Sequence, residues 1–188
     1  AAASSLPPEG VGSAVGRPPA NTRKGSETMS KILGHLEPQA VFHYFEEIAA
    51  IPHGSRNTKK IADYCEQFAK DRGLQHTRDA SDNVIIVKPA AKGYETAAPV
   101  VLQGHLDMVC EKAPGCTKDM ETEGLDLVEE NGWVYARGTT LGGDDGIAVA
   151  MMLALLDEKD LPAPRLECII TSDEEIGMLG AAVLQPTL

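Results

Sequence analysis

Three short apolar runs constrain the fold of this chain most strongly. They are residues 83–88 (NVIIVK), 100–102 (VVL) and 165–171 (RLECIIT). Their apolar residues do not alternate strictly with polar ones, which is typical of strands covered on both faces. Because segments with helical periodicity are interspersed among these runs, the sequence predicts an α/β fold. We expect a mostly parallel sheet sandwiched by helices.

Three segments carry the helical periodicity. Residues 38–50 have apolar side chains at three- and four-residue spacings, with Pro38 near the first turn. Residues 57–72 repeat this pattern and are followed by Gly73, a common residue at helix ends. Residues 145–156 are apolar nearly all round, which predicts a buried helix.

Two further strand signals complete the expected elements. Residues 75–78 are predicted to form a short strand after the second helix. Residues 126–129 and 133–136 flank Glu130-Asn131-Gly132, and Asn-Gly is a strong signal for a tight hairpin turn. No internal repeat is visible.

The first 28 residues differ from the rest of the chain. They are rich in Ala, Gly, Pro and Ser, contain no aromatic residue and show no periodic apolar face. Such a segment buries too little surface to offset its ordering entropy. We therefore expect residues 1–28 to be a disordered leader or a remnant of processing, and residues 29–188 to hold the folded part.

Composition excludes several functional classes. With 17 Lys and Arg against 28 Asp and Glu, the net charge is −11, which argues against binding to nucleic acid. No run approaches the roughly 20 apolar residues of a membrane span. The four cysteines lack the spacing of a disulfide scaffold, and no signal peptide is evident, so we expect free thiols and a cytoplasmic protein.

Candidate site residues follow the second apolar run directly. In the segment Gly104-His105-Leu106-Asp107, residues two apart in extended backbone point to the same face. His105 can therefore act as a metal ligand whose second ring nitrogen is oriented by Asp107. A His and an Asp at this spacing also occur together in ordinary turns, so the pair alone is weak.

Two acidic segments follow later in the chain. Asp144 and Asp145 lie among glycines just before the third helix, where one of them can simply cap the helix. Asp173, Glu174 and Glu175 follow the last apolar run, and such a run of acids is often only a solvated surface. Three like charges this close nevertheless raise a pKa or favour a bound cation.

Considered together, the three segments indicate a metal-dependent hydrolase. Open α/β sheets bind ligands outside the carboxyl ends of their strands, where these segments are expected. The imidazole and carboxylate donors suit zinc, with manganese or cobalt as alternatives. Zinc lowers the pKa of bound water toward about 7, and a carboxylate then serves as general base. No Gly-x-Ser-x-Gly elbow, phosphate-binding loop or twelve-residue calcium loop is present.

The same motifs resemble the co-catalytic zinc metallopeptidase superfamily, and in particular its aminoacyl-histidine dipeptidases (peptidase D). The resemblance covers the chain from Met29 to its end and is carried by residues 102–109, by residues 138–142 with Asp144 and Gly146, and by residues 171–178. It implies the catalytic domain of a zinc peptidase and hydrolysis of dipeptides, among them Xaa-His dipeptides such as carnosine.

The resemblance also implies a role for each residue that matches the motifs. His105 would bind one zinc and Glu175 the other, with Asp144 bridging the two. Glu174 would be the general base, and Asp107 would orient His105. Asp145 stands where relatives often have Asn.

A further Asp and a late His, together with a lid domain that dimerises, would lie beyond Leu188. The resemblance therefore implies an N-terminal piece of a homodimeric enzyme, with an incomplete site. Two alternatives stay open at this point. One is a related zinc amidohydrolase, such as an acyl-amino-acid deacylase or an aminopeptidase, and the other is a fragment without catalytic activity.

Overall fold

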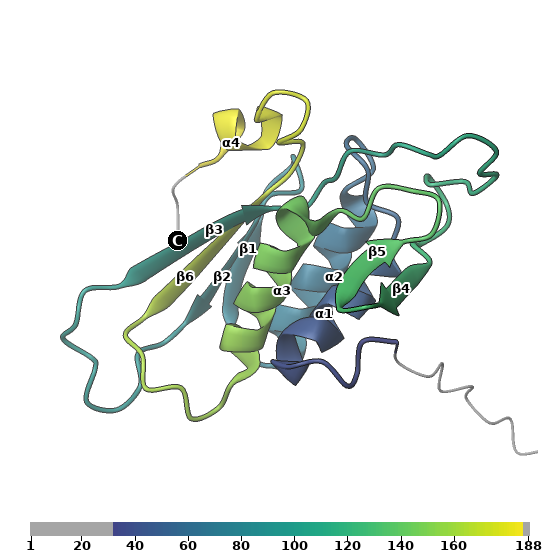
Figure 1. Ribbon diagram of the computed structural model, residues 1–188. Coiled ribbons are helices and arrows are strands. Elements are labelled where there is room, and N and C mark those ends of the chain that lie inside the picture. The colour runs from purple at the N-terminus through teal and green to yellow at the C-terminus, as the bar shows by residue number, and fades with distance from the viewer. Residues whose placement is uncertain (1–31, 186–188) are drawn as a thin grey trace, which may run out of the picture. The chain divides into compact units, whose positions relative to one another are not determined.

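A computed structural model describes residues 32–185, and the predicted leader lies outside them. The elements follow one another as α1 (Gln39–Ala49), α2 (Lys59–Asp71), β1 (Gln75–Arg78), β2 (Val84–Lys88), β3 (Val100–His105), β4 (Leu127–Glu130), β5 (Trp133–Ala136), α3 (Gly143–Asp157), β6 (Leu166–Thr171) and α4 (Leu179–Val183). The predicted α/β fold is confirmed (Figure 1).

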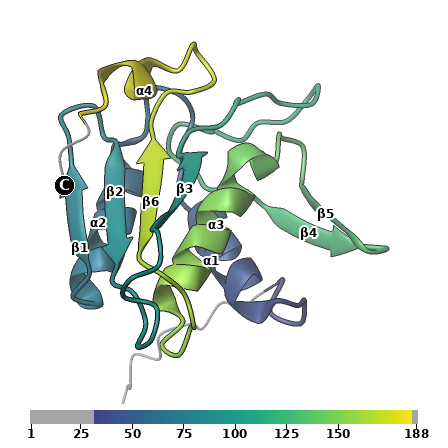
Figure 2. The ribbon, with the colours of Figure 1, turned by 90° about the vertical axis from the view of Figure 1, so that its left-hand side faces the viewer.

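The main sheet is mixed rather than mostly parallel. Its strands lie in the order β1-β2-β6-β3 (Figure 2). β2 is antiparallel to both of its neighbours, while β3 and β6 are parallel. The reason is the short connection between β1 and β2, because a tight turn can only join antiparallel strands. Strands β3 and β6 are far apart in sequence, and the segment between them contains helix α3.

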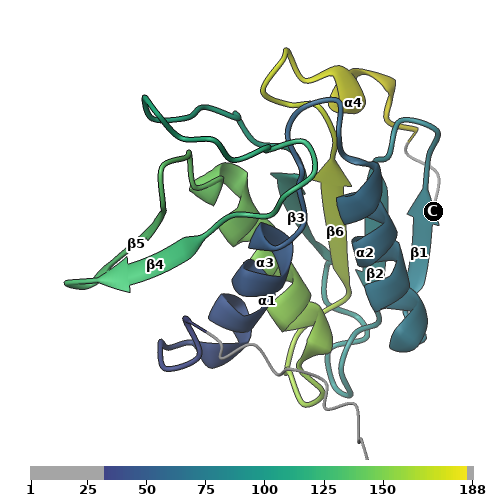
Figure 3. The ribbon, with the colours of Figure 1, turned by 90° about the vertical axis from the view of Figure 1, so that its right-hand side faces the viewer.

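The long helices cover one face of this sheet. Helix α3 packs against β3 and β6, helix α2 packs against β1 and β2, and helix α1 packs on α3 (Figure 3). The three long helices therefore all lie on one face of the sheet. On the other face Ile85 and Val87 of β2 are also buried, whereas the edge strand β3 leaves Val100 and Val101 exposed by 41% and 54%.

A single apolar cluster joins the helices to the sheet. Phe45 and Ile48 of α1, Leu153 of α3 and Ile86 and Ile170 of the sheet are all buried in it. Burial of such side chains is the main favourable contribution to folding. The cluster therefore fixes the beginning of α3 relative to the ends of β3 and β6.

The largest differences from the sequence prediction concern β3 and α4. Strand β3 continues three residues further than expected and includes His105 as its last residue. Helix α4 was not predicted. The hairpin of β4 and β5 is confirmed, with Asn131 and Gly132 at φ values of 55° and 79° as a tight two-residue turn requires.

Two further expectations concern the described residues. All four cysteines are free, as predicted. No helix among residues 32–185 is long and apolar enough to cross a membrane.

Replacing Leu153 with alanine tests the core. Leu153 is fully buried, so its truncation leaves a cavity and should lower the free energy of unfolding by about 2–5 kcal/mol. Leu155 on the same helix is 36% exposed, and Leu155→Ala is the matched control with an expected change of about 0.5 kcal/mol or less. Urea unfolding measures both. Equal losses in the two variants would contradict the assigned core.

Candidate metal centre

The candidate site lies where β3 and β6 end. These two strands are parallel neighbours, and His105, the last residue of β3, is in register with Thr171, the last residue of β6. The N–H of Leu106 donates to the carbonyl of Thr171 at 2.7 Å. The loops that follow both strands therefore leave the same edge of the sheet (Figure 1).

The imidazole of His105 has carboxylates on both sides. Its Nδ1 lies 2.9 Å from the backbone oxygen of Asp107 and 3.5 Å from Asp107 Oδ1. Its Nε2 lies 3.1 Å from Asp144 Oδ1 and 3.7 Å from Glu174 Oε2. The ring is buried, so its orientation is set by these partners. One ring nitrogen is thus held by Asp107, and the other faces a cluster of acids.

Asp107 connects three segments of the chain through a buried carboxylate. Ser55 donates its hydroxyl to Oδ2 at 2.7 Å. The backbone N–H groups of Glu174 and Glu175 donate to Oδ1 at 2.8 Å and to Oδ2 at 3.3 Å. Together with His105 these donors satisfy a charge that would be costly to bury alone.

Helix α3 brings Asp144 to the site. The residue preceding the helix is Gly142, which has no side chain to cap it, and Asp144 and Asp145 have non-helical backbone angles. Asp144 therefore does not behave as a simple helix cap, since its carboxylate lies against His105 and its side chain is 88% exposed.

The glycine before His105 allows this close approach. A Cβ on Gly104 would lie 2.7 Å from Asp145 Oδ2 and 3.0 Å from Met152 Cε, which is too close for real side chains. The carboxylate of Asp145 is thus packed against β3, and His105 supplies it with a backbone hydrogen bond. Asp145 turns toward the strand, whereas Asp144 reaches the imidazole.

The acids after β6 divide between two cavities. Glu174 lines a cavity of about 510 Å³ together with His105 and Asp144. Glu175 lines a different cavity of about 760 Å³ together with Ser55 and other residues of segments 54–57, 108–111 and 120–122. The two residues therefore border different cavities, although one oxygen of each lies within 4.8 Å of the other.

The predicted site residues come together only in part. Two groups place one potential ligand atom per residue within 4.8 Å of one another, namely His105 with Asp144 and Asp145, and His105 with Glu174 and Glu175. Within residues 32–185, no single group of this kind joins His105, Asp144 and Glu175. His105 is the residue that the two groups share.

These donors fit a divalent metal ion. Each group offers one imidazole nitrogen and two carboxylates, a set that suits zinc and related first-row metals. The imidazole is already oriented through its second nitrogen, as metal-binding histidines usually are.

Comparison with known proteins agrees with this geometry. Residues 101–186 match Peptidase family M20/M25/M40. Residues 101–186 therefore carry the sequence pattern of a peptidase M20 domain. The resemblance noted from the three motifs is thereby confirmed at the level of the family.

Individual relatives include two dipeptidases. The chain is 41% identical over 153 residues to the cytosol non-specific dipeptidase of Escherichia coli (strain K12), covering 81% of this chain and 32% of that protein. The crystal structure of aminoacylhistidine dipeptidase from Vibrio alginolyticus matches with a TM-score of 0.79 and 38% identity, covering 86% of this chain and 33% of that one.

A third relative has a different name. The acetylornithine deacetylase of Myxococcus xanthus is 31% identical over 119 residues, which cover 63% of this chain and 27% of that protein. In each of these comparisons the present chain spans about a third or less of the relative's length.

Ser55 is a residue of the candidate site that the sequence analysis missed. It lies in the break after α1, and only its hydrogen bond to Asp107 reveals a role. The signal available in the sequence was the motif Ile51-Pro52-His53-Gly54-Ser55, which interrupts a helix. The parallel bridge between Gly54 and Met108 places this segment beside the end of β3.

The two central ionisable groups shift each other in opposite directions. Burial favours the neutral form of His105, but the hydrogen bonds that its ring N–H groups donate to Asp107 and Asp144 outweigh it and raise the pKa of His105 from 6.5 to about 9. Burial likewise favours neutral Asp107, yet its hydrogen bonds with His105, Ser55 and the two backbone N–H groups lower its pKa from 3.8 to about 2.

These shifts predict how the stability of the metal-free chain depends on pH. The His105 contribution is fully present below about pH 6.5 and is lost as the pH rises through about 9, because the folded-state pKa is raised. The Asp107 contribution is present above about pH 3.8 and is lost as the pH falls through about 2. The stabilisation from this pair is thus greatest between those limits.

Asp107→Asn, which keeps the shape and removes the charge, isolates this contribution. We expect the difference in the free energy of unfolding between wild type and variant to be largest between about pH 4 and 6.5 and to shrink on either side. Urea unfolding with a chelator present measures it. The His105 ring protons, followed by NMR, should titrate at lower pH in the variant. A pH-independent difference would contradict the assigned coupling.

Proposed function

We propose that this protein is a zinc-dependent dipeptidase whose catalytic centre is built around His105. The observation that carries the proposal is the imidazole held by buried Asp107 at one nitrogen and facing Asp144 and Glu174 at the other. The names of the two dipeptidases among the relatives support the reaction class. The chain spans about a third of their length, so activity and substrate are parts of the proposal.

In the proposed site, His105 and Glu175 would each hold a zinc ion, and Asp144 would be a ligand shared by the two. Bound zinc supplies a water of lowered pKa and polarises the scissile carbonyl. Asp144 and Glu175 each have a carboxylate oxygen close to the imidazole of His105 or to its acidic neighbours, which supports their assignment as ligands. Manganese or cobalt would be held by the same donors.

Glu174 is the proposed general base. Its carboxylate lines the same cavity as His105 and Asp144, so it can accept a proton from a nucleophile bound there. Asp107 acts as the orienting partner of His105 and, through two backbone hydrogen bonds, also holds the segment that carries Glu174. Asp145 is assigned a structural role, because its carboxylate packs against β3.

The proposed substrates are dipeptides, including those with a C-terminal histidine. This extends to the present chain what the name of the Vibrio alginolyticus relative says of that protein. The word cytosol in the name of the Escherichia coli relative supports a cytoplasmic location. A homodimer of the full-length protein stays a proposal that rests on the resemblance alone.

Zinc titration of the chain by calorimetry tests the metal site. His105→Ala and Asp144→Ala should each weaken binding by about tenfold or more, equivalent to about 1.4 kcal/mol, because each removes a ligand. Because zinc binding must displace the proton of His105, the affinity should rise with pH up to about 9. Asp160→Ala, an exposed acid at the other end of α3, is the control. Equal affinities in all variants would reject the site.

Glu174→Gln tests the assigned base in a form of the protein that hydrolyses dipeptides. The amide cannot accept the proton, so turnover should fall by about 10²–10⁴-fold while zinc affinity is retained. Hydrolysis is followed by release of free amino acids from an Xaa-His dipeptide. Near-normal turnover at saturating zinc would exclude Glu174 as the base.

Parallel assays with N-acetyl amino acids separate the proposal from its main alternative. The deacetylase among the relatives motivates this second function. Cleavage of the acetyl substrates without cleavage of dipeptides would favour the amidohydrolase. Zinc binding without hydrolysis of either class by any form of the protein would favour a role without catalysis.

A further inference from the structure

The acidic loop, defined as residues 172–180, is closed at its neck by one buried side chain. The N–H of Gly180 donates to the carbonyl of Ser172 at 3.1 Å, which brings the two ends of the loop together. Asn83 spans both ends: its Oδ1 accepts from the Ser172 N–H at 2.9 Å, and its Nδ2 donates to the Gly180 carbonyl at 2.9 Å.

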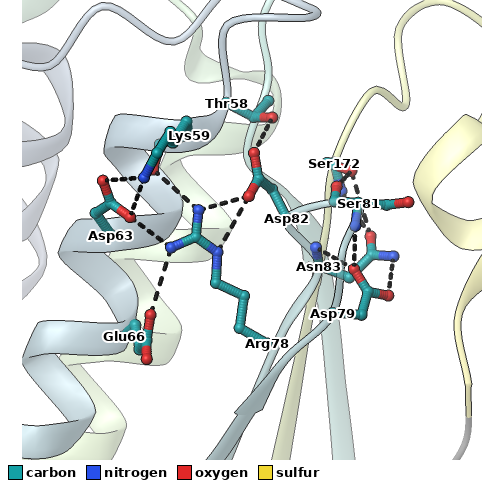
Figure 4. A network of polar contacts seen from close by, with 10 residues as sticks. All are labelled: Thr58, Lys59, Asp63, Glu66, Arg78, Asp79, Ser81, Asp82, Asn83 and Ser172. Carbon is teal, nitrogen blue, oxygen red and sulfur yellow. Dashed lines mark hydrogen bonds and ion pairs between the residues drawn. The ribbon is translucent and has the colours of Figure 1, made fainter.

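Asn83 is itself fixed by the turn between β1 and β2. It is only 1% exposed, and its Nδ2 also donates to Asp79 Oδ2 at 2.7 Å (Figure 4). The hydroxyl of Ser172 donates to the carbonyl of Ser81 in the same turn. The turn and the neck of the acidic loop are therefore joined by buried hydrogen bonds whose donors and acceptors are all matched.

Gly180 is shaped for this contact. A Cβ at this position would lie 2.5 Å from Asn83 Oδ1 and 2.3 Å from the Ser172 carbonyl. Any side chain would thus force the neck apart. Because Gly180 has no side chain, the amide of Asn83 can lie directly against its backbone.

The backbone of the loop needs such support. Asp173 and Met178 have φ values of 50° and 56°, a left-handed region that residues other than glycine rarely adopt. Residues in such conformations persist when the surrounding structure holds them. The Arg56 N–H bonded to Asp173 Oδ1 at 2.6 Å holds one side of the loop, and Asn83 holds its neck.

We propose that Asn83 is a positioning residue for the metal centre, acting through the acidic loop on Glu174 and Glu175. The N–H groups of these two acids reach Asp107 only if the loop leaves β6 in the observed direction. Asn83 sets that direction from a turn on the far side of β6. This inference rests on the proposed function for its catalytic meaning, whereas its structural part stands independently.

Asn83→Asp tests the proposal with an isosteric change. It replaces the Nδ2 donor with an oxygen that faces the acceptors on Gly180 and Asp79. The matched control is Asp82→Asn, one residue away, whose carboxylate faces Thr58 and Arg78 rather than the loop. Both swaps exchange an acid and an amide of the same shape.

Two measurements on the full chain are expected to separate these variants. Amide hydrogen exchange in the metal-free chain should accelerate about tenfold or more at Glu174 and Glu175 in Asn83→Asp, with the amides of β6 unchanged. Zinc affinity at neutral pH should fall by about 10- to 100-fold, as for other residues that hold metal ligands in place. Asp82→Asn should leave loop exchange and zinc affinity at wild-type values.

Loop exchange at the wild-type rate in Asn83→Asp would overturn the proposal, whatever the zinc affinity. A uniform acceleration over β6 and the loop would also overturn it, because that pattern reports general destabilisation. If Asn83→Asp does not fold, Gly180→Ala opens the same neck from the other side and is judged by the same exchange pattern. Absence of zinc binding in the wild type would reject the proposed function and leave the exchange result to decide the role of Asn83.

Discussion

A buried carboxylate at Asp107 is the constraint on which the geometry of this site depends. A charge in that position is tolerated only when hydrogen bonds replace its lost water. Its donors come from the segment after α1, from the end of β3 and from the segment after β6. Three segments distant in sequence are thus held to one point. His105, the proposed metal ligand, and the backbone of Glu174, the proposed base, both bind the Asp107 carboxylate.

Close approach of backbone makes this anchoring possible. Gly104 lets the beginning of α3 lie against β3, so that Asp144 reaches His105 from a different element. Gly142 has a φ of +66°, and a Cβ at this position would lie only 2.7 Å from Met108 Sδ. The glycines around the acids therefore serve packing between elements as much as flexibility, and their cost in chain entropy is offset at the site.

The sequence predicts the elements of this fold much better than it predicts their arrangement. Helical periodicity identified α1, α2 and α3, and short apolar runs identified β2, β3 and β6, because burial acts on each element separately. The position of β2 between β1 and β6 depends on contacts between distant segments, which leave no periodic signal. For this reason the sheet was expected to be mostly parallel, whereas two of its three strand pairings are antiparallel.

The same distinction applies to the site. The proximity of His105, Asp144 and Glu174 could be predicted from sequence, because ionisable residues gather there directly after apolar strands and at the start of an apolar helix. Ser55 and Asn83 could not, since a serine in a helix break and an asparagine at a turn have common explanations in local structure. Their roles arise only from partners 52 and 89 or more residues away.

The neighbouring acids Glu174 and Glu175 show how one anchored segment can serve two tasks. Their N–H groups bind the two oxygens of the same carboxylate, so the backbone between them is fixed on one side. Their side chains nevertheless line different cavities. In the proposed enzyme Glu174, whose Oε2 lies 3.7 Å from His105 Nε2, is the proton acceptor and Glu175 is a metal ligand. One oxygen of each acid lies within 4.8 Å of the other and of the imidazole, so a cation held between them would offset their mutual repulsion.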